Sequence, residues 1–148
     1  MYSLTEVELD HPALVALFAS LSDALGGDAE DEPKLSYTEA GLLTAVVAWH
    51  DGKAVGCGLL RQADSSKAEI KRMYSLQAGV GSAILYFLEQ KALAAGFQSV
   101  LASVRIINAK ALNFYLHKGY KKCPSYGKYR YSSQHMCLEK PLSQVVTV

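Results

Sequence analysis

The stretch Ser75-Leu76-Gln77-Ala78-Gly79-Val80-Gly81-Ser82 decides the fold, because a predicted strand ends there and an apolar helix begins at two closely spaced glycines. A second helix start follows at Asn108-x-x-Ala111-x-x-x-Tyr115. Backbone N–H groups in the first turn of a helix lack partners and lie at the positive end of the helix dipole, so they stabilise a bound anion. Glycine lets such a ligand approach the backbone closely. The two helix starts therefore predict an anion site.

The pair Gly79 and Gly81 is a weak signal on its own. A tight strand-to-helix turn needs glycine for its positive φ whether or not a ligand binds. A dinucleotide-binding fingerprint would need a third glycine at position 84, where the chain has Ile84, and the sequence lacks the Gly-Lys-Ser/Thr of a P-loop. Both nucleotide-binding patterns are therefore disfavoured. Specificity comes from the second helix start, whose three named residues share one side of a helix.

Length and composition fit a single domain over residues 1–148, since half of the residues are apolar and a fifth are charged. The net charge of +1 arises from scattered residues of both signs, so we expect no nucleic-acid partner. No apolar run reaches the roughly 18 residues of a membrane span, and we expect no membrane partner. The N-terminus lacks a signal segment and the three cysteines are not spaced like metal ligands, which favours a cytoplasmic location, reduced thiols and no metal.

Alternating and periodic apolar residues predict the remaining elements. A hairpin is expected where Leu43–His50 and Lys53–Leu60 flank Asp51-Gly52, a pair that suits a two-residue type I′ turn. The other expected elements are strands at Tyr2–Leu9, Lys67–Tyr74, Ser99–Val104, Tyr120 onward and Ser132–Lys140, and helices from Pro12, near Ser36, over Gly79–Ala95 and after Asn108.

This order of elements predicts an α+β fold with a single mixed sheet of about six or seven strands and helices on both faces. An antiparallel meander and a parallel β-α-β crossover would meet within the sheet, which can splay there and hold a ligand in the crevice. Strict alternation in Lys67–Tyr74 predicts two sets of side chains on opposite faces, one of Glu69, Lys71 and Met73 and the other of Ile70, Arg72 and Tyr74.

Residues 68–120 resemble the GNAT superfamily of acetyl-coenzyme A dependent N-acetyltransferases. The motifs that carry the resemblance are Ala68–Tyr74, Gly79–Leu85 and Asn108–Tyr120. One part departs from the family pattern. Family members usually carry Arg or Gln three residues before the first glycine of the turn, where this chain has Leu76, and the loop is several residues shorter here.

The resemblance implies that acetyl-CoA binds as a co-substrate. Backbone groups of Met73 and Tyr74 would pair with the pantetheine arm as an added strand does. Asn108 and Ala111 would also belong to the coenzyme site, although a helix cap alone would explain Asn108. The pyrophosphate would face the backbone N–H groups of Gln77, Ala78, Gly79, Val80, Gly81 and Ser82.

The same resemblance implies two catalytic residues. An amine must be uncharged to attack a thioester, yet a lysine-like amine of pKa near 10.4 is almost wholly protonated at pH 7. Glu69 is the candidate general base, and an ion pair with Lys71 or a hairpin neighbour is the alternative. Tyr115 is the candidate general acid, because a phenol of pKa about 10 keeps its proton at neutral pH and can donate it to a departing thiolate. A plain core tyrosine is the alternative.

The acceptor is expected to be the amine of a small molecule or peptide. The acidic residues Asp28, Glu30, Asp31 and Glu32 lie where similar proteins shape the acceptor pocket. They would suit a cationic amine, or they form a solvated charged loop. On the other side of the pocket, or merely covering the sheet, we expect Tyr126, Tyr129 and Tyr131.

These residues favour an N-acetyltransferase that works by direct attack of the amine within a ternary complex. The alternative is a non-catalytic module of the same fold that binds or senses an acyl-CoA. Cys57 and Cys123 are interpreted as core residues rather than acyl carriers. An exposed strand edge and the apolar tail Val145-Val146-Thr147-Val148 make a homodimer formed by strand pairing a reasonable hypothesis.

Overall fold

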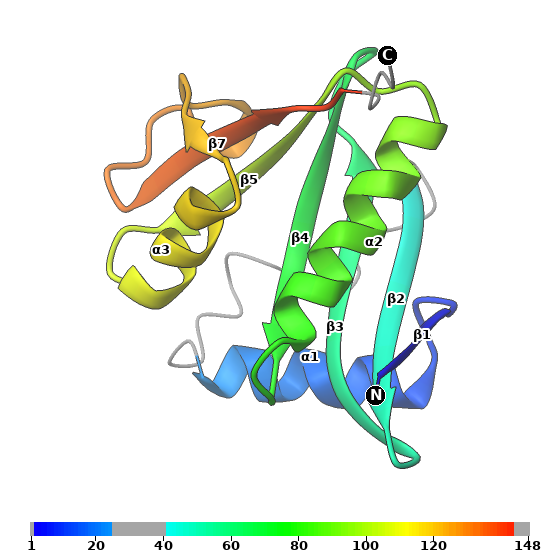
Figure 1. Cartoon of the computed structure of the whole chain (residues 1–148). Coiled ribbons are helices and arrows are strands. Elements are labelled where there is room, and N and C mark those ends of the chain that lie inside the picture. Colours follow the sequence, from blue (N-terminus) through cyan, green and yellow to red (C-terminus); the bar gives the residue numbers. More distant parts are fainter. Residues whose placement is uncertain (1, 25–40, 144–148) are drawn as a thin grey trace.

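One seven-stranded mixed sheet forms the centre of the protein (Figure 1). The computed structural model describes residues 2–24 and 41–143. Neighbouring strands are antiparallel except β4 and β5, which are parallel. In their order across the sheet, the strands are β1 (Ser3–Glu6), β2 (Leu42–His50), β3 (Lys53–Gln62), β4 (Lys67–Ser75), β5 (Ser99–Arg105), β7 (His135–Pro141) and β6 (Lys121–Lys122).

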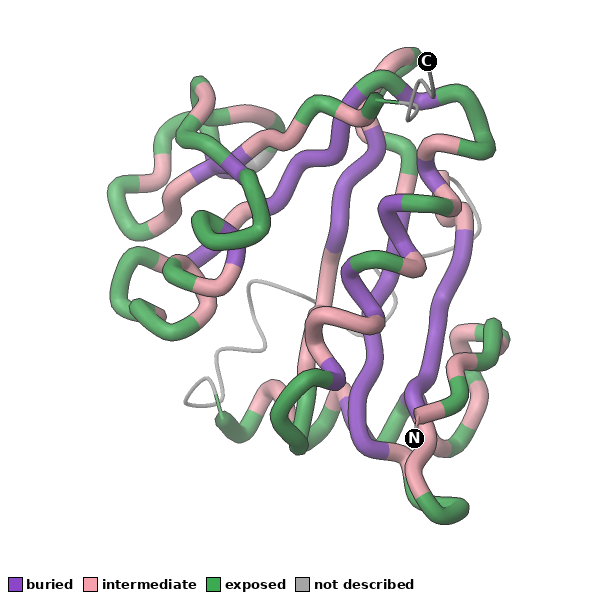
Figure 2. The backbone as a smooth tube through the Cα atoms, in the orientation of Figure 1, coloured by how far each residue is buried: buried purple, intermediate pink, exposed green. Residues whose placement is uncertain are grey.

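Helices cover both faces of the sheet, as the sequence predicts. Helix α1 (Pro12–Ala24) packs on one face, where Leu14 and Leu59 belong to the same buried cluster. Helices α2 (Val80–Ala94) and α3 (Ala109–His117) share the opposite face and form a larger cluster with the reverse sides of the same strands. Figure 2 shows the buried segments concentrated along the central strands. The prediction of a layered α+β fold is confirmed.

The parallel strands β4 and β5 are paired only over their first halves. Their register runs from Lys67 opposite Ser99 to Ile70 opposite Ala102, and beyond that point the strands diverge (Figure 1). Strand β5 stays paired with β7 along its whole length. Within the described structure, residues 71–75 of β4 have only β3 as a paired neighbour. The predicted splay is therefore present, and it leaves one edge of β4 open.

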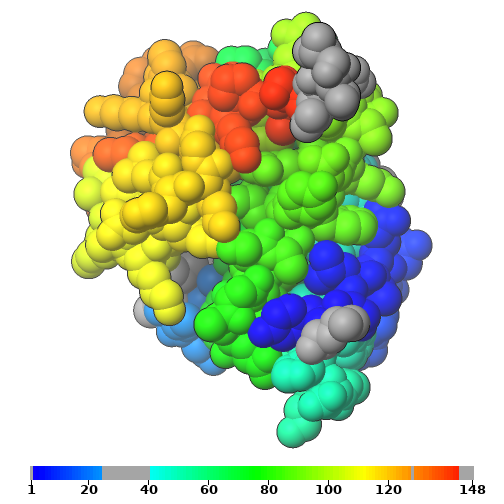
Figure 3. Space-filling model, in the orientation of Figure 1, coloured from blue at the N-terminus to red at the C-terminus, as the bar shows by residue number. Residues whose placement is uncertain are grey.

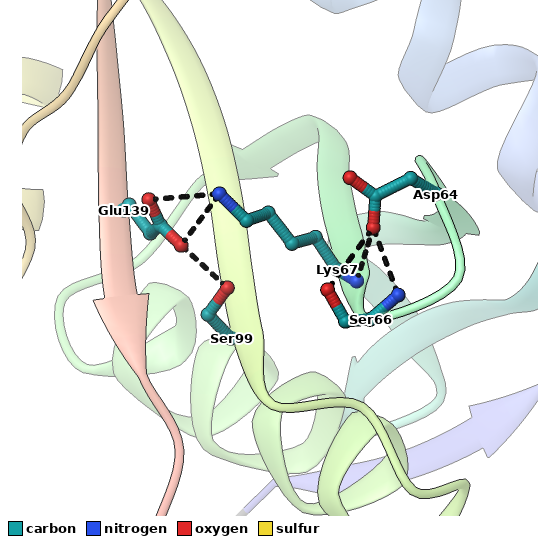
Figure 4. A network of polar contacts seen from close by, with 5 residues as sticks. All are labelled: Asp64, Ser66, Lys67, Ser99 and Glu139. Atoms are coloured by element: carbon teal, nitrogen blue, oxygen red, sulfur yellow. Dashed lines mark hydrogen bonds and ion pairs between the residues drawn. The ribbon is translucent and has the colours of Figure 1, made fainter.

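Polar side chains link β4, β5 and β7 at the start of the β4–β5 pairing, near Lys67 and Ser99, which we call the closed end of the two strands. The Lys67 ammonium lies 3.2 Å from the Glu139 carboxylate of β7, and the Ser99 hydroxyl of β5 donates to the same carboxylate at 2.6 Å (Figure 4). In the turn before β4, Asp64 accepts hydrogen bonds from the backbone N–H groups of Ser66 and Lys67. Strands β4, β5 and β7 are thus fixed to one another at one end, while β4 and β5 part at the other.

A β-bulge in β4 contradicts the strict alternation expected for this strand. The β3–β4 register carries one extra residue on β4 between Lys71 and Tyr74, and Arg72 has a left-handed φ of +54°. Side chains change faces past such a bulge. Met73 accordingly joins the α2 cluster and Tyr74 joins the α1 cluster. The predicted grouping of Met73 with Glu69 and Lys71 is therefore wrong.

Local turns follow the sequence predictions closely. Asp51 (φ +52°) and Gly52 (φ +77°) connect β2 to β3 with the two positive φ angles of a type I′ turn. Gly79 (φ +86°) is the N-cap of α2, and Gly96 (φ +93°) follows its C-cap. Both ends of the longest helix are therefore encoded by glycine, as predicted.

Three predicted features lie outside the described residues: the short helix near Ser36, the acidic loop that includes Asp28 and Glu32, and the apolar tail from Val145 to Val148. None of the described helices is long and apolar enough to cross a membrane. Over residues 2–24 and 41–143, His, Cys, Asp and Glu side chains form no group of three or more that could hold a metal ion.

At Gly56 on β3, helix α2 lies too close to the sheet for a larger residue. A Cβ there would lie 2.6 Å from Val80 Cγ1 and 2.9 Å from the Tyr74 carbonyl oxygen. We expect Gly56→Ala to lower the free energy of unfolding by about 1–3 kcal/mol, because the helix must move off the strand. Chemical denaturation measures the loss. Gly81→Ala is the matched control, since its Cβ would meet no atom closer than 3.5 Å. Equal stability of the two variants would contradict this packing.

Candidate functional site

The turn into α2 presents backbone N–H groups without backbone partners. Val80 N–H donates to the Gln77 carbonyl at 3.3 Å, whereas no described backbone carbonyl accepts from Gly81 or Ser82. The first turn of α2 also carries no acidic side chain that would neutralise the positive end of the helix dipole. The turn therefore has the properties of an anion site, as the sequence predicts.

Gly79 and Gly81 are glycines for different reasons. Gly79 has a φ of +86°, so its backbone conformation alone favours glycine. Gly81 has no positive φ, and a Cβ there would meet the Ser75 hydroxyl at 3.5 Å and the Phe114 ring at 3.6 Å, both ordinary contacts. The fold does not require glycine at position 81. The predicted close approach of a ligand to the backbone would account for the glycine.

Helix α3 lies beside this turn. The Phe114 ring of α3 faces Gly81, and the surfaces of α3 (yellow) and α2 (green) lie next to each other in Figure 3. Asn108 caps α3, because its Oδ1 accepts a hydrogen bond from the Ala111 N–H at 3.2 Å. The cap is confirmed and accounts for Asn108 without a ligand. Contacts of Asn108 and Ala111 with a pantetheine arm stay predictions.

The open edge of β4 begins just past the parallel pairing and leads toward the α2 turn. Met73 and Tyr74, which the sequence assigns to pantetheine binding, lie on this edge. Tyr74 is paired with β3 on one side, while β5 has diverged on the other. Alternate backbone N–H and C=O groups of a strand point to each edge, so an extended amide chain can pair there as an added strand.

Tyr115 is a buried tyrosine on the α2 side of the sheet. Its ring meets those of Phe114 and Tyr120 edge to face, with centroids 5.3 and 5.2 Å apart. Burial raises the pKa of Tyr115 above its usual value of 10.0, and the Glu89 carboxylate raises it further. The phenol therefore keeps its proton at neutral pH. This state fits the predicted general acid and also the alternative of a core tyrosine.

Glu89 of α2 is a buried carboxylate that the sequence reasoning missed. The Tyr120 hydroxyl donates to one Glu89 oxygen at 2.8 Å, and the Lys140 ammonium lies 3.1 Å from the other. Because the Tyr120 ring contacts Tyr115, this network supports one side of the candidate acid. A signal was present in the sequence, since Glu89 interrupts the apolar stripe of α2 next to Leu88.

Glu69 lies on the other face of β4, with 4% of its side chain exposed. Arg61 Nη1 donates to one carboxylate oxygen at 2.8 Å, and the Tyr126 hydroxyl donates to the other at 3.1 Å. The Lys71 ammonium is 3.8 Å from that second oxygen. The ion pairs that formed the alternative interpretation are therefore present. The role of Glu69 as a base stays a prediction.

The candidate acid and the candidate base face opposite sides of the sheet. Ile70 belongs to the same buried cluster as Tyr115, on the α2 side. Its neighbours Glu69 and Lys71 therefore point to the α1 side. Ile70 is also the last residue of β4 paired with β5. A phenol and a carboxylate thus lie on opposite faces of the sheet, and the carboxylate lies next to the point where the sheet opens.

Of the three tyrosines predicted to line a pocket, two gather beside Glu69. The rings of Tyr126 and Tyr129 meet edge to face with centroids 5.8 Å apart, and the Tyr129 hydroxyl contacts the Lys71 ammonium. Burial raises the pKa of Tyr126, and the nearby Glu69 charge adds to the effect. Tyr131 is 92% exposed and does not take part in this cluster.

The thiols of Cys57 and Cys123 are protonated at neutral pH. Burial raises the pKa of Cys57 to about 12 and is also the main cause that raises the pKa of Cys123 to about 11. A thiol is a much weaker nucleophile than a thiolate. This chemistry supports the interpretation of both cysteines as structural residues rather than acyl carriers.

Known proteins share this sequence pattern and this fold. The sequence model of the Acetyltransferase (GNAT) family matches residues 13–120. A relative named IAA acetyltransferase, from Azospirillum brasilense, is 28% identical over 102 residues, which cover 66% of this chain and 67% of that protein.

Solved structures extend the likeness to nearly the whole chain. A protein of Klebsiella pneumoniae subsp. pneumoniae MGH 78578, provisionally assigned as an acyl-CoA N-acyltransferase, superposes with a TM-score of 0.83 at 26% identity and covers 97% of this chain and 99% of its own. The PaiA N-acetyltransferase of Thermoplasma acidophilum, in complex with coenzyme A, gives 0.74 at 18% identity over 96% and 99% of the two chains. At that lower identity the likeness concerns the fold alone.

Gly81→Ala separates folding from ligand binding. We expect the free energy of unfolding to be unchanged or raised by up to about 1 kcal/mol, since alanine is the better helix former. The added Cβ would reach into the anion site, and we expect coenzyme A to bind at least about tenfold more weakly, equivalent to 1.4 kcal/mol. Calorimetric titration measures the affinity. Unchanged affinity would show that no ligand approaches position 81.

Alkaline pH should destabilise the protein through three phenols whose pKa values are raised. The pKa values of Tyr115, Tyr120 and Tyr126 are all raised above 10.0, in each case chiefly by burial. Unfolded phenols lose their protons near pH 10 while the folded ones keep theirs, so the free energy of unfolding falls as pH rises past that value. Thermal melts across this range measure the fall, and Tyr120→Phe should make it shallower. An identical slope in that variant would contradict the assignment.

Proposed function

Because the chain belongs to the acetyltransferase (GNAT) family, we propose that it transfers the acetyl group of acetyl-CoA to the primary amine of a small molecule or peptide. One observation carries the proposal. The open edge of β4 extends from the α2 turn, some of whose N–H groups lack backbone partners among the described residues, to the end of the β4–β5 pairing beside Glu69, and Tyr115 belongs to the buried cluster on the other face of the sheet.

The residues of the turn and of the open edge fit the coenzyme. In this proposal the N–H groups of Gly81 and Ser82, with those of the loop before them, bind the pyrophosphate. Backbone groups of Met73 and Tyr74 bind the pantetheine amides. When bound, acetyl-CoA supplies an activated acetyl group as a thioester, whose thiolate is released as the acetyl group passes to the amine nitrogen.

Tyr115 acts as the proton donor to that thiolate. Its raised pKa keeps the hydroxyl protonated at neutral pH, and its burial among aromatic rings keeps bulk water away. The contact with Tyr120, which Glu89 holds through a hydrogen bond, fixes one side of the ring. A positioned donor of this kind typically contributes a rate factor of about 10²–10⁴.

Glu69 acts as the proton acceptor for the amine, which approaches from the α1 side. Its carboxylate can take the proton directly or through a water molecule. Arg61 and Lys71 pair with this carboxylate and hold its orientation. We propose an acceptor that reaches this face past Tyr126 and Tyr129, with a cationic amine as the preferred class.

A second function is favoured by the partners of Glu69. Arg61 and Tyr126 each occupy one of its two carboxylate oxygens. If these bonds persist when an amine is bound, the protein binds or senses an acyl-CoA without turnover. Release of thiol from acetyl-CoA over a panel of cationic, neutral and anionic primary amines separates the two functions. Binding of coenzyme A with no thiol release from any amine would favour the sensing module.

Tyr115→Phe removes only the hydroxyl. With an amine that the wild-type protein acetylates, we expect kcat to fall by about 10²-fold because the leaving thiolate receives no proton. The affinity for coenzyme A should stay within about twofold, since the ring remains in place. Thiol release and calorimetric titration give the two values. Unchanged turnover would leave Tyr115 as a core tyrosine.

Glu69→Gln tests the base while it keeps the side-chain shape. The amide oxygen can still accept from Arg61, so we expect the variant to fold and to bind coenzyme A, with kcat lower by about 10²-fold. Glu139→Gln is the matched control, because Glu139 is also an ion-paired carboxylate but lies at the closed end of the strands. Equal turnover in the two variants would reduce Glu69 to a structural ion pair.

A further inference from the structure

The loop before α2 is held from outside by two residues that are far away in the sequence. The Tyr2 hydroxyl donates to the Ala78 carbonyl at 2.9 Å, and Tyr2 Cε2 lies 3.9 Å from where a Cβ of Gly79 would be. His50 Nδ1 is 3.0 Å from Gln77 Oε1, an oxygen that can only accept. In Figure 3 the N-terminal residues (dark blue) lie against the start of α2 (green).

These two residues also support each other. The rings of Tyr2 and His50 meet edge to face, with centroids 5.4 Å apart and an interplanar angle of 80°. At the start of the loop, Leu76 N–H donates to the Val55 carbonyl of β3 at 2.8 Å. Leu76, Gln77 and Ala78 therefore contact β3, β2 and the N-terminal segment, respectively.

The hydrogen bond from Tyr2 fixes the direction of a backbone N–H group in the turn. The described chain contains no cis peptide bond, and in a trans peptide the C=O and N–H groups point in opposite directions. Because the Ala78 carbonyl points to Tyr2, the N–H of Gly79 points away from it. The same carbonyl would be the helical acceptor for Ser82 N–H, and in this orientation that N–H stays open.

We propose that Tyr2 and His50 are positioning residues for the pyrophosphate of coenzyme A. Tyr2 orients the peptide between Ala78 and Gly79, and His50 holds the side chain of Gln77, so that the N–H groups of the turn face the phosphates. In this proposal, these contacts fix the shape of a turn that is shorter than in the family it resembles. At Leu76, where family members usually carry Arg or Gln, this turn has no polar side chain.

The proposal rests on the proposed function, since it assumes that the α2 turn binds the coenzyme. It predicts a difference between the binding of coenzyme A and of pantetheine that a general loss of stability would not produce. Pantetheine lacks the pyrophosphate but keeps the amides that pair with β4. Loss of the Tyr2 and His50 contacts should therefore weaken the binding of coenzyme A and leave the binding of pantetheine unchanged.

The experiment uses the full chain with any affinity tag at the C-terminus, away from Tyr2. Tyr2→Phe removes one hydroxyl, and His50→Phe keeps a ring beside Tyr2 but removes its nitrogens. Tyr86→Phe is the matched control, because Tyr86 of α2 is 65% exposed and its hydroxyl lies outside the proposed site. Dissociation constants for coenzyme A and pantetheine come from amide NMR titrations, in which the Gly79 N–H reports directly on the turn. Thermal melts confirm that each variant is folded.

We expect Tyr2→Phe to raise the Kd of coenzyme A by about 3- to 10-fold, the effect of one lost hydrogen bond, with the Kd of pantetheine within about twofold of wild type. His50→Phe should act in the same direction, and Tyr86→Phe should change neither value. Equal affinities of wild type and Tyr2→Phe for coenzyme A would overturn the proposal, as would an equal loss for both ligands. Failure of the wild-type protein to bind coenzyme A would instead overturn the proposed function, and this proposal with it.

Discussion

The end of the β4–β5 pairing at Ile70 is the constraint on which the rest of the structure depends. Up to that residue the strands share a parallel ladder, and Lys67 and Ser99 fix its closed end on Glu139. Beyond it, no strand of the described residues pairs with the backbone N–H and C=O groups on one edge of β4. Backbone polar groups that leave water need partners. The sheet therefore contains an internal edge that an extended amide ligand can complete, with Tyr115 and Glu69 on its two faces.

Backbone geometry brings the candidate anion-binding turn to that edge. The bulge at Arg72 turns Met73 toward α2, and Gly56 lets Val80 approach β3 closely. The turn at Gly79 then lies where the open edge ends. In the proposed binding mode, the ligand contacts mainly main-chain groups. This mode explains how the turn can lack a basic side chain and still carry the properties of an anion site.

Features encoded by neighbouring residues could be predicted from the sequence, and features that need distant partners could not. The I′ turn at Asp51-Gly52 and the caps at Gly79 and Asn108 depend on local conformational preferences, and all three are present. The bulge depends on the register between two strands, which no single strand reveals. The hydrogen bond from Tyr126 to Glu69 and the contact of Tyr2 with the loop join residues that are 57 and 76 positions apart. Nor does sequence alone give the depth of burial that raises the pKa of Tyr115.

A crystal structure with bound coenzyme A tests the central claim most directly. The account predicts that the pantetheine arm lies along residues 71–75 of β4, that its amides pair with the backbone of Met73 and Tyr74, and that the pyrophosphate contacts the N–H groups of Gly81 and Ser82. A coenzyme bound elsewhere on the protein, with this edge of β4 left unpaired, would contradict it.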